Sequence, residues 1–221
     1  NGTSFLPVGT LTGTTFSTAT LTTNMAQAKY IARYRDRLYL LNTKSAGVEY
    51  PYRVYFSSVP SAGTISWSTA DFFDVDPGEA IVGGTSKCDK LIILTDTGCW
   101  IYDQTQKKKI AETGCSNHRT IKSSNTYTFF ANADGVWAST GGTPENISGE
   151  MIDFFRNATP ANFFAEVIDE EYNIYVGTVT VNSITYANTV CTYNIPTGTW
   201  RWRELAQNMT SFAKYNSSGV R

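Results

Sequence analysis

The sequence has 221 residues, of which 41% are hydrophobic and 17% charged, and its formal net charge is −1. A chain of this length can bury one sizeable core. Its near-neutral charge provides no overall basic field that would favour nucleic acid or anionic membranes. No apolar run approaches the roughly 20 residues that a membrane-spanning helix needs.

The first 27 residues are rich in Thr and Gly, and we expect residues 1–27 to form an N-terminal arm or an edge strand. After this arm the pattern changes to β-rich runs separated by turn residues. The run KYIARYRDRLYLLN at 29–42 predicts a strand, a tight turn at residues 35–37 and a second strand. Further strands are predicted at 53–59 and 64–73, and an acidic loop follows them. These four strands form a first group.

Comparable groups follow along the chain. Residues 80–114 and 118–148 each divide into four extended pieces separated by turns. The one predicted helix comes next, at 149–158, because its apolar residues have rough helical spacing. A longer fourth group occupies 165–205, and the run SFAKYNSSGV at 211–220 begins a fifth.

One short pattern occurs three times in these groups: a β-rich run, a polar turn and then Gly-x-Trp opening the next run. We expect the Gly to supply positive φ at a hairpin turn, and the Trp to begin the return strand with a large buried ring. The first two copies lie 37 residues apart, which is one group, and the third follows after 63 because the helix and the longer fourth group intervene. The copies are Gly98 and Trp100, Gly135 and Trp137, and Gly198 and Trp200.

Repeated groups of roughly 36–50 residues with four short strands each predict an all-β fold, a β-propeller-like array of four-stranded blades. We expect residues 28–221 to hold about four blades and the start of another. A pair of immunoglobulin-like sandwiches is the alternative, but it explains the recurring hairpin less well. The sequence stops just after a turn cluster where a strand should follow. We therefore also expect it to be a fragment of a larger propeller.

The order of the runs resembles a known family. Residues 28–156, a little over half of the chain, are similar to the propeller domain of tail proteins of short-tailed bacteriophages, the nozzle and DNA-stabilisation (tail accessory) components. The resemblance is carried by YIARYRDRLYLLN, PYRVYFSSVPSAGTISWS, DFFDVDPGEAIVGG, KLIILTDTGCWIY, the Gly114-Cys115 step into HRTI, TYTFFANADGVW and PENISGEMIDFF.

This resemblance implies a structural component of a virion, such as a tail nozzle, hub or tail accessory protein. It implies location in the phage tail, protein–protein contacts with other tail subunits and a homo-oligomeric ring. It also implies passage of DNA through the assembly without specific nucleic-acid binding, and no enzyme chemistry. The alternative function is a carbohydrate-binding propeller, receptor-binding or lectin-like.

A sialidase-like glycosidase is a third function. The turns TDTGCW and NADGVW are similar to the Asp-box of sialidase propellers, although both are one residue short of it. A sialidase also needs an arginine triad and a Tyr nucleophile, which the sequence does not provide in a recognisable pattern. Plain hairpin turns explain both segments better.

Two carboxylate clusters are candidate cation or acid–base sites. Asp71, Asp74, Asp76 and Glu79 of the acidic loop would offer oxygen ligands to Ca²⁺. Pro77 and the missing bidentate Glu further on favour a turn-forming loop instead. The second cluster, residues 169–171, falls where a turn between strands is expected, so a solvated turn is favoured over catalysis.

Basic and aromatic side chains provide further candidates. Arginines at 33, 35 and 37 alternate, which would place them on one strand face as part of a positive ring, unless a turn at Asp36 breaks the alternation. Lysines at 107–109 are typical of a charged edge strand that discourages unwanted pairing. Aromatic residues can form a sugar-binding or protein-binding patch, although most belong to the core of a propeller. The candidates are Tyr50, Tyr52, Tyr55, Trp67 and Trp202.

Residues for catalysis or metal binding do not cluster in the sequence. His118 is the only histidine, and no nucleophile elbow marks a partner for it. The four cysteines, Cys88, Cys99, Cys115 and Cys191, show no C-x-x-C spacing and are best explained as small buried residues. We therefore predict no enzyme, no catalytic residue, no cofactor and no metal site.

Overall fold

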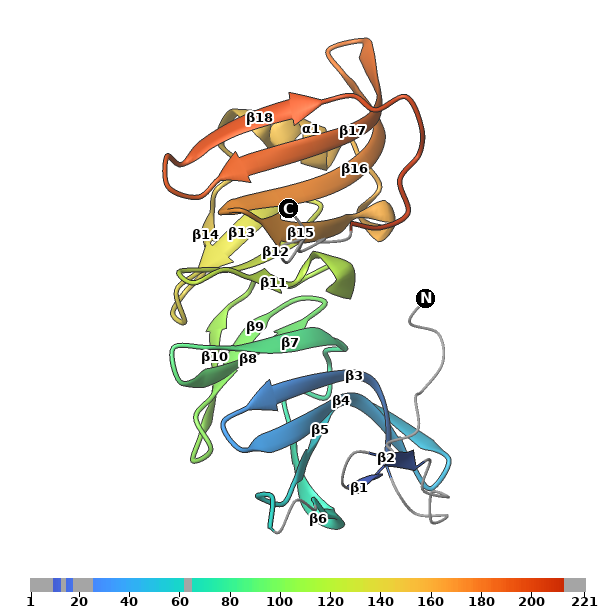
Figure 1. The fold of residues 1–221 in the computed structure, drawn as a ribbon, viewed down its shortest axis with the longest axis vertical. Coiled ribbons are helices and arrows are strands. Elements are labelled where there is room, and N and C mark those ends of the chain that lie inside the picture. Colours follow the sequence, from blue (N-terminus) through green and yellow to red (C-terminus); the bar gives the residue numbers. More distant parts are fainter. Residues whose placement is uncertain (1–9, 13–14, 18–25, 62–64, 213–221) are drawn as a thin grey trace, which may run out of the picture. The chain divides into compact units, whose positions relative to one another are not determined.

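The computed structural model describes residues 10–12, 15–17, 26–61 and 65–212. In these residues the chain folds into four four-stranded antiparallel sheets and one two-stranded hairpin (Figure 1). Each four-stranded sheet is a meander of strands consecutive in sequence, whereas an immunoglobulin-like sandwich would pair strands far apart in sequence. Successive four-stranded meanders are the blades of a propeller. The chain is an all-β, β-propeller-like array, as the sequence predicts.

The blades belong to two compact units. The first unit comprises residues 1–115 and 140–143, and the second comprises residues 116–139 and 144–221. Each unit holds two of the four blades and has a hydrophobic core of its own.

In the first unit, the two blades share one core. Tyr39, Leu41 and Val54 of the first blade pack with Leu91 and Ile93 of the second, and all five are at most 1% exposed. The first blade has the order β3-β4-β5-β6 and the second β10-β9-β8-β7. The strands are β3 (Gln27–Tyr34), β4 (Arg37–Ser45), β5 (Val48–Ser57), β6 (Trp67–Asp74), β7 (Ile81–Lys87), β8 (Lys90–Thr95), β9 (Cys99–Tyr102) and β10 (Lys107–Ala111).

A bulge in the first blade explains how a proline fits inside β5. The β4–β5 register moves from Leu41 opposite Val54 to Thr43 opposite Tyr50, so Pro51 lies in the irregular stretch. A proline cannot donate to a regular ladder and is tolerated at a bulge. Asn42 at the bulge has φ 56°, and its side-chain amide donates to the carbonyl oxygen of Ile81 at 2.8 Å.

In the second unit, the two blades again share one core. Phe129 and Val136 of the third blade pack with Tyr172, Ile174 and Cys191 of the fourth, all of them fully buried. The orders are β11-β12-β13-β14 and β15-β16-β17-β18. The strands are β11 (Lys122–Ser123), β12 (Thr128–Asn132), β13 (Gly135–Ser139), β14 (Glu145–Asn146), β15 (Phe164–Ile168), β16 (Glu171–Val181), β17 (Ile184–Asn194) and β18 (Thr199–Arg203).

The helical segment is shorter than predicted for 149–158. A 3₁₀ turn, η2 (Gly149–Met151), leads into α1 (Ile152–Arg156), whose Phe154 and Phe155 are buried in the core of the second unit. The helix ends at its C-cap residue Asn157, whose backbone N–H and side-chain amide both donate to the carbonyl oxygen of Asp153, at 3.1 Å and 2.8 Å. Two further 3₁₀ turns precede strands: η1 (His118–Thr120) comes before β11, and η3 (Pro160–Asn162) lies between α1 and β15.

Both predicted ends of the array fall largely outside the described residues. Within the predicted arm of residues 1–27, β1 (Thr10–Thr12) pairs with β2 (Thr15–Ser17), and β3 begins at Gln27. The other residues of the arm, except 26, lie outside the described part of the chain. The predicted start of a fifth blade, residues 211–220, lies outside it from residue 213 onwards.

Candidate functional site

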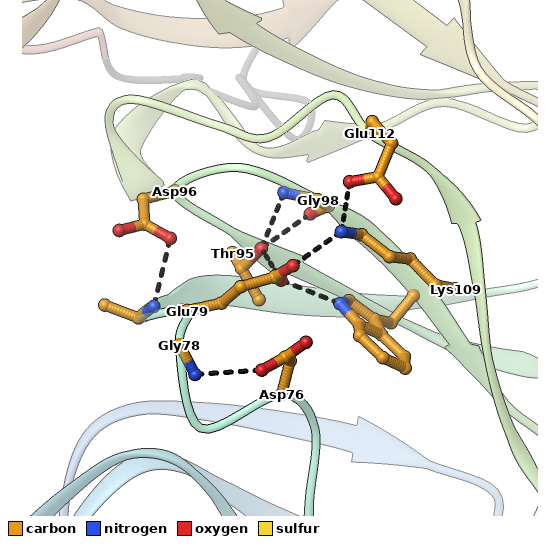
Figure 2. A network of polar contacts seen from close by, with 10 residues as sticks. Asp76, Gly78, Glu79, Thr95, Asp96, Gly98, Lys109 and Glu112 are labelled. Atoms are coloured by element: carbon orange, nitrogen blue, oxygen red, sulfur yellow. Dashed lines mark hydrogen bonds and ion pairs between the residues drawn. The ribbon is translucent and has the colours of Figure 1, made fainter.

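The acidic loop ends in a buried carboxylate that crosses one end of the second blade (Figure 2). Glu79, just before β7, is only 7% exposed, and its Oε1 lies 2.6 Å from the Lys109 ammonium on the opposite edge strand β10. Between these two strands, its Oε2 accepts hydrogen bonds from the Thr95 hydroxyl at 2.5 Å and the Trp100 indole at 2.9 Å. One side chain thus contacts residues of β8, β9 and β10.

The environment of Glu79 favours its charged form. Burial by itself raises the pKa of a carboxyl group, but the bonds from Lys109, Thr95 and Trp100 outweigh it and hold the pKa of Glu79 below its usual range. The contact with Glu112, together with the contact with Glu79, raises the pKa of Lys109. A pair held in this way is a structural ion pair rather than a general acid or base.

Two other carboxylates of the candidate Ca²⁺ cluster also serve local structure. Asp74 on β6 forms a bidentate ion pair with Arg53 on β5, with N···O distances of 2.6 Å and 2.8 Å. Asp76 accepts the backbone N–H of Gly78 at 2.9 Å and closes a turn. No three His, Cys, Asp or Glu residues among those described are placed to hold one metal ion. Asp71, on β6, is half-buried.

The second carboxylate run forms the turn that the sequence predicts. Asp169 and Glu170 are the two exposed residues between β15 and β16, with φ of 48° and 64°. Glu171, the first residue of β16, pairs with Arg201 on β18 at 2.6 Å. The run is therefore spread over a turn and a strand.

The alternating arginines do not share one strand face, because the chain turns between them. Arg33 lies on β3, Arg35 in the turn and Arg37 at the start of β4. Arg35 binds Asp89 of the neighbouring β7–β8 turn through two bonds, at 2.8 Å and 2.5 Å. Arg37 donates to the carbonyl oxygen of Ser57 at 2.8 Å. The turn at Asp36 therefore breaks the alternation, and the alternative of a positive segment on one strand face does not hold.

The predicted lysine edge strand is confirmed, since β10 is the outermost strand of its sheet. Its three lysines differ in their contacts. Lys107 donates to the carbonyl oxygen of Asp74, and Lys109 pairs with Glu79, while Lys108 is exposed.

The three Gly-x-Trp segments all form hairpin turns, but they differ in detail from the prediction. Gly135 and Gly198 have positive φ, 127° and 69°, whereas Gly98 does not. Glycine is needed at position 98 for a different reason: a Cβ there would lie 2.6 Å from Lys109 Cε and 3.0 Å from Glu79 Oε2. The third copy also occupies a different place: it joins the third and fourth strands of its blade, and the others join the second and third.

The tryptophans are half-buried rather than fully buried, and each indole N–H is bonded. Trp100 donates to Glu79 Oε2 at 2.9 Å, Trp137 to Asn132 Oδ1 at 3.1 Å and Trp200 to the carbonyl oxygen of Ile147 at 2.6 Å. A half-buried indole whose N–H is hydrogen-bonded holds the end of its sheet in place.

The candidate aromatic patch is divided between core and surface. Tyr55 is 4% exposed and Tyr52 packs against the core of the first unit, while Trp67 packs beside Tyr55. Tyr50 lies under the Arg53 guanidinium, 4.1 Å from its ring centroid. Only Trp202 of the five is exposed, at 44%.

Sequence patterns alone did not reveal the surroundings of His118. In the folded chain it lines an open hollow of about 230 Å³ in the second unit, together with Arg119, Lys122 and Glu166. The four cysteines are free thiols; Cys88 is exposed and the other three are buried. Burial raises the pKa of Cys99 and of Cys191 to about 12, so these thiols are not activated nucleophiles.

No protein-family model matches the chain, and no curated protein matches its sequence. Among solved structures, the chain is similar to BamB from Moraxella catarrhalis, with 13% identity and a TM-score of 0.47 over 83% of this chain and 52% of that one. It is also similar to apo AztD from Citrobacter koseri, with 8% identity and a TM-score of 0.48 over 81% and 47%. The chain therefore spans about half the length of each protein. Neither likeness indicates a function for this chain.

No helix in the described part of the chain is long and apolar enough to cross a membrane.

Proposed function

We propose that this chain is a non-enzymatic structural module of a bacteriophage virion, a tail nozzle, hub or tail accessory protein, that acts through protein–protein contacts. The tail assignment rests on the resemblance of residues 28–156 to short-tailed phage tail proteins. The contact role rests on the surface of the first blade.

The observation that carries the contact role is an apolar row across the first blade. Ile31, Leu40, Tyr55 and Phe72 are successive cross-strand partners on β3, β4, β5 and β6. We call these four residues the outer row. Partners in a ladder point to the same face of a sheet. Leu40 and Tyr55 in the middle are buried, whereas Ile31 and Phe72 at the two ends are 59% and 38% exposed.

The outer row lies on the face opposite to the shared core of the first unit. Its residues Leu40 and Tyr55 alternate in sequence with Leu41 and Val54, which pack against the second blade. The small cluster on the outer face contains Leu40, Tyr55 and Trp67, and its described members all precede the second blade. A propeller blade needs cover on both faces, so we assign a blade of a second copy of this chain to this face.

The charged side chains of the first unit support a structural role. Those that looked most like ligands in the sequence, Asp74, Asp76 and Glu79, are engaged in an ion pair, a turn and a buried network. Such contacts rigidify the blades, and we assign the binding of other subunits to the exposed surfaces of the blades. The proposal places the copies in an oligomeric ring of the phage tail, in contact with other tail subunits and surrounding DNA that passes through without sequence-specific binding.

Carbohydrate binding is the second candidate function, and one observation favours it. Trp202 on β18 is 44% exposed and lies edge-on to Tyr186, with ring centroids 4.8 Å apart, and near Phe154, at 5.9 Å. An exposed tryptophan supported by other rings offers a flat surface on which a sugar ring can stack.

Native mass spectrometry and a glycan array distinguish the two candidates. The structural proposal predicts a defined oligomer of the 221-residue chain and no retained glycan. A monomer at every concentration that retains a glycan, with binding lost in Trp202→Ala, would overturn it in favour of carbohydrate recognition.

A further inference from the structure

The second unit contains an open hollow whose lining brings three basic side chains together. It has a volume of about 230 Å³. We call it the basic hollow, and six of the residues that line it are His118, Arg119, Lys122, Phe164, Glu166 and Phe212. Three of the six can carry positive charge and one is a carboxylate, so the lining has a formal charge of +1 with His118 neutral.

We propose that the basic hollow binds a small oxyanion, a carboxylate or a phosphate-like group. This function is independent of the proposed assembly role, and it uses residues of the second unit only.

The two permanent cations keep donors for such a ligand. Within the described residues, Arg119 donates a hydrogen bond to the carbonyl oxygen of Thr210, and Lys122 donates one to Glu166 Oε2 at 2.9 Å. A guanidinium has five N–H donors and an ammonium three. The fork of a guanidinium matches the geometry of a carboxylate or phosphate.

Aromatic rings fix the position of the guanidinium. The Arg119 Cζ atom lies 4.5 Å from the centroid of the Phe164 ring, a distance at which a cation is attracted to the ring face. Phe164 is itself held by Tyr175 on one side, with centroids 4.9 Å apart, and contacts Phe212 at 5.4 Å. These apolar rings also offer a surface for the body of an organic anion.

The turn η1, which contains His118 and Arg119, is hydrogen-bonded to the core of the second unit. Asn117 caps η1 by accepting the backbone N–H of Arg119 at 3.0 Å. The next residue, Thr120, is fully buried; its carbonyl oxygen accepts the hydroxyl of Tyr172 at 3.0 Å, and its own hydroxyl oxygen accepts the backbone N–H of Ala131 at 3.1 Å. A site held in this way is preorganised, which lowers the entropic cost of binding.

His118 lines the hollow and is the only histidine in the sequence, so its imidazole signal reports on the hollow without ambiguity. Burial, together with the positive charges of Arg119 and Lys122, lowers its pKa below the usual value of about 6.5. Glu166 is the one carboxylate in the lining. An anion bound beside these groups would favour the protonated imidazole and raise the pKa again.

The test is a proton NMR titration of His118 in the full chain, in sodium sulfate and in sodium chloride at equal ionic strength. Sulfate stays a dianion over the pH range of the titration, so only the protein titrates. We expect sulfate to raise the pKa of His118 by about half a unit or more relative to chloride. The titration is repeated in sodium phenylacetate, and a rise in the pKa of His118 in that salt alone identifies a carboxylate site. Equal pKa values in all three salts would overturn the proposal.

Variants assign the effect to the hollow. Arg119→Gln should weaken binding at least about tenfold, because a charged hydrogen bond is lost. Glu166→Gln should tighten it, because a negative charge is removed and Lys122 is released. Arg156→Gln, at an exposed arginine of α1 that does not line the hollow, should leave it unchanged. A change at Arg156 as large as that at Arg119, or weaker binding in Glu166→Gln, would contradict the assignment.

Discussion

At the scale of single residues, Glu79 shows how a position can look like a ligand and serve as a structural link. Its sequence context, an acidic loop with D-x-D-x-G spacing, is compatible with Ca²⁺ binding. The partners that decide its role, Thr95, Trp100 and Lys109, lie 16 to 30 residues further along the chain. Sequence spacing does not show which of these side chains meets the carboxylate.

Neutralising Glu79 should therefore destabilise the chain. We expect Glu79→Gln to lower the free energy of unfolding by about 2 kcal/mol at pH 7, because a buried partner of Lys109 is lost. Urea unfolding measures the change. Glu112→Gln is the matched control, since Glu112 contacts the same ammonium but its side chain is 80% exposed. Equal losses in the two variants would show that burial of Glu79 does not matter.

The pH dependence of the same variant has a defined sign. The folded state holds the pKa of Glu79 below its unfolded value, so its stabilisation is complete above the unfolded pKa of about 4.3 and is lost as the pH falls through the folded pKa. The difference in stability between wild type and Glu79→Gln should thus shrink from pH 6 towards pH 3. Urea unfolding across this range would contradict the account if the difference stayed constant.

At the scale of elements, local sequence predicts strands well and their connections less well. The alternating runs of the first blade and the turn at residues 35–37 are found close to their predicted positions. The third Gly-x-Trp copy was placed correctly as a hairpin, but the pattern could not show which pair of strands it joins. A hairpin between the second and third strands of a blade and one between the third and fourth need the same Gly and the same anchoring indole.

The role of Gly at a hairpin also depends on neighbours that the sequence does not identify. At Gly135 both reasons for glycine coincide: its φ is 127°, and an added Cβ would lie 2.0 Å from Ser148 Oγ. That hydroxyl oxygen accepts the backbone N–H of Val136 at 2.8 Å. The hairpin and the segment after β14 are therefore joined at this point.

Gly135→Ala should be strongly destabilising for these two reasons. We expect a loss of about 2 kcal/mol or more, because the methyl group would displace Ser148 and the backbone would be strained. Thermal and urea unfolding measure it. Gly142→Ala is the control, since φ there is not in the left-handed region and no atom lies within 4 Å of an added Cβ. A near-neutral Gly135→Ala would contradict the packing described here.

At the scale of the whole molecule, the periodicity of the sequence predicts the all-β blades but not the grouping into two units. Four groups of strands are visible as repeats, whereas the shared cores arise from residues such as Leu41 and Ile93 that meet only in the folded chain. The basic hollow was missed for the same reason, because residues 118–122, 164–166 and 211–212 converge on it from separate segments. His118 alone carried no signal of its neighbours.

The outer row belongs to this scale because it concerns contacts between molecules. Its exposed ends, Ile31 and Phe72, would be covered by a blade of another copy in the proposed assembly. An exposed apolar position elsewhere should not matter to that contact. Ile184, at the start of β17 in the second unit, is 57% exposed and provides the comparison.

Analytical ultracentrifugation of the 221-residue chain and its variants tests the central claim most directly. The account predicts a concentration-dependent oligomer for the wild type and for Ile184→Asp, and at least a tenfold weaker association for Ile31→Asp and for Phe72→Asp, with the circular dichroism of a folded chain in every case. A wild type that stays monomeric at all concentrations, or association that survives both outer-row substitutions, would contradict it.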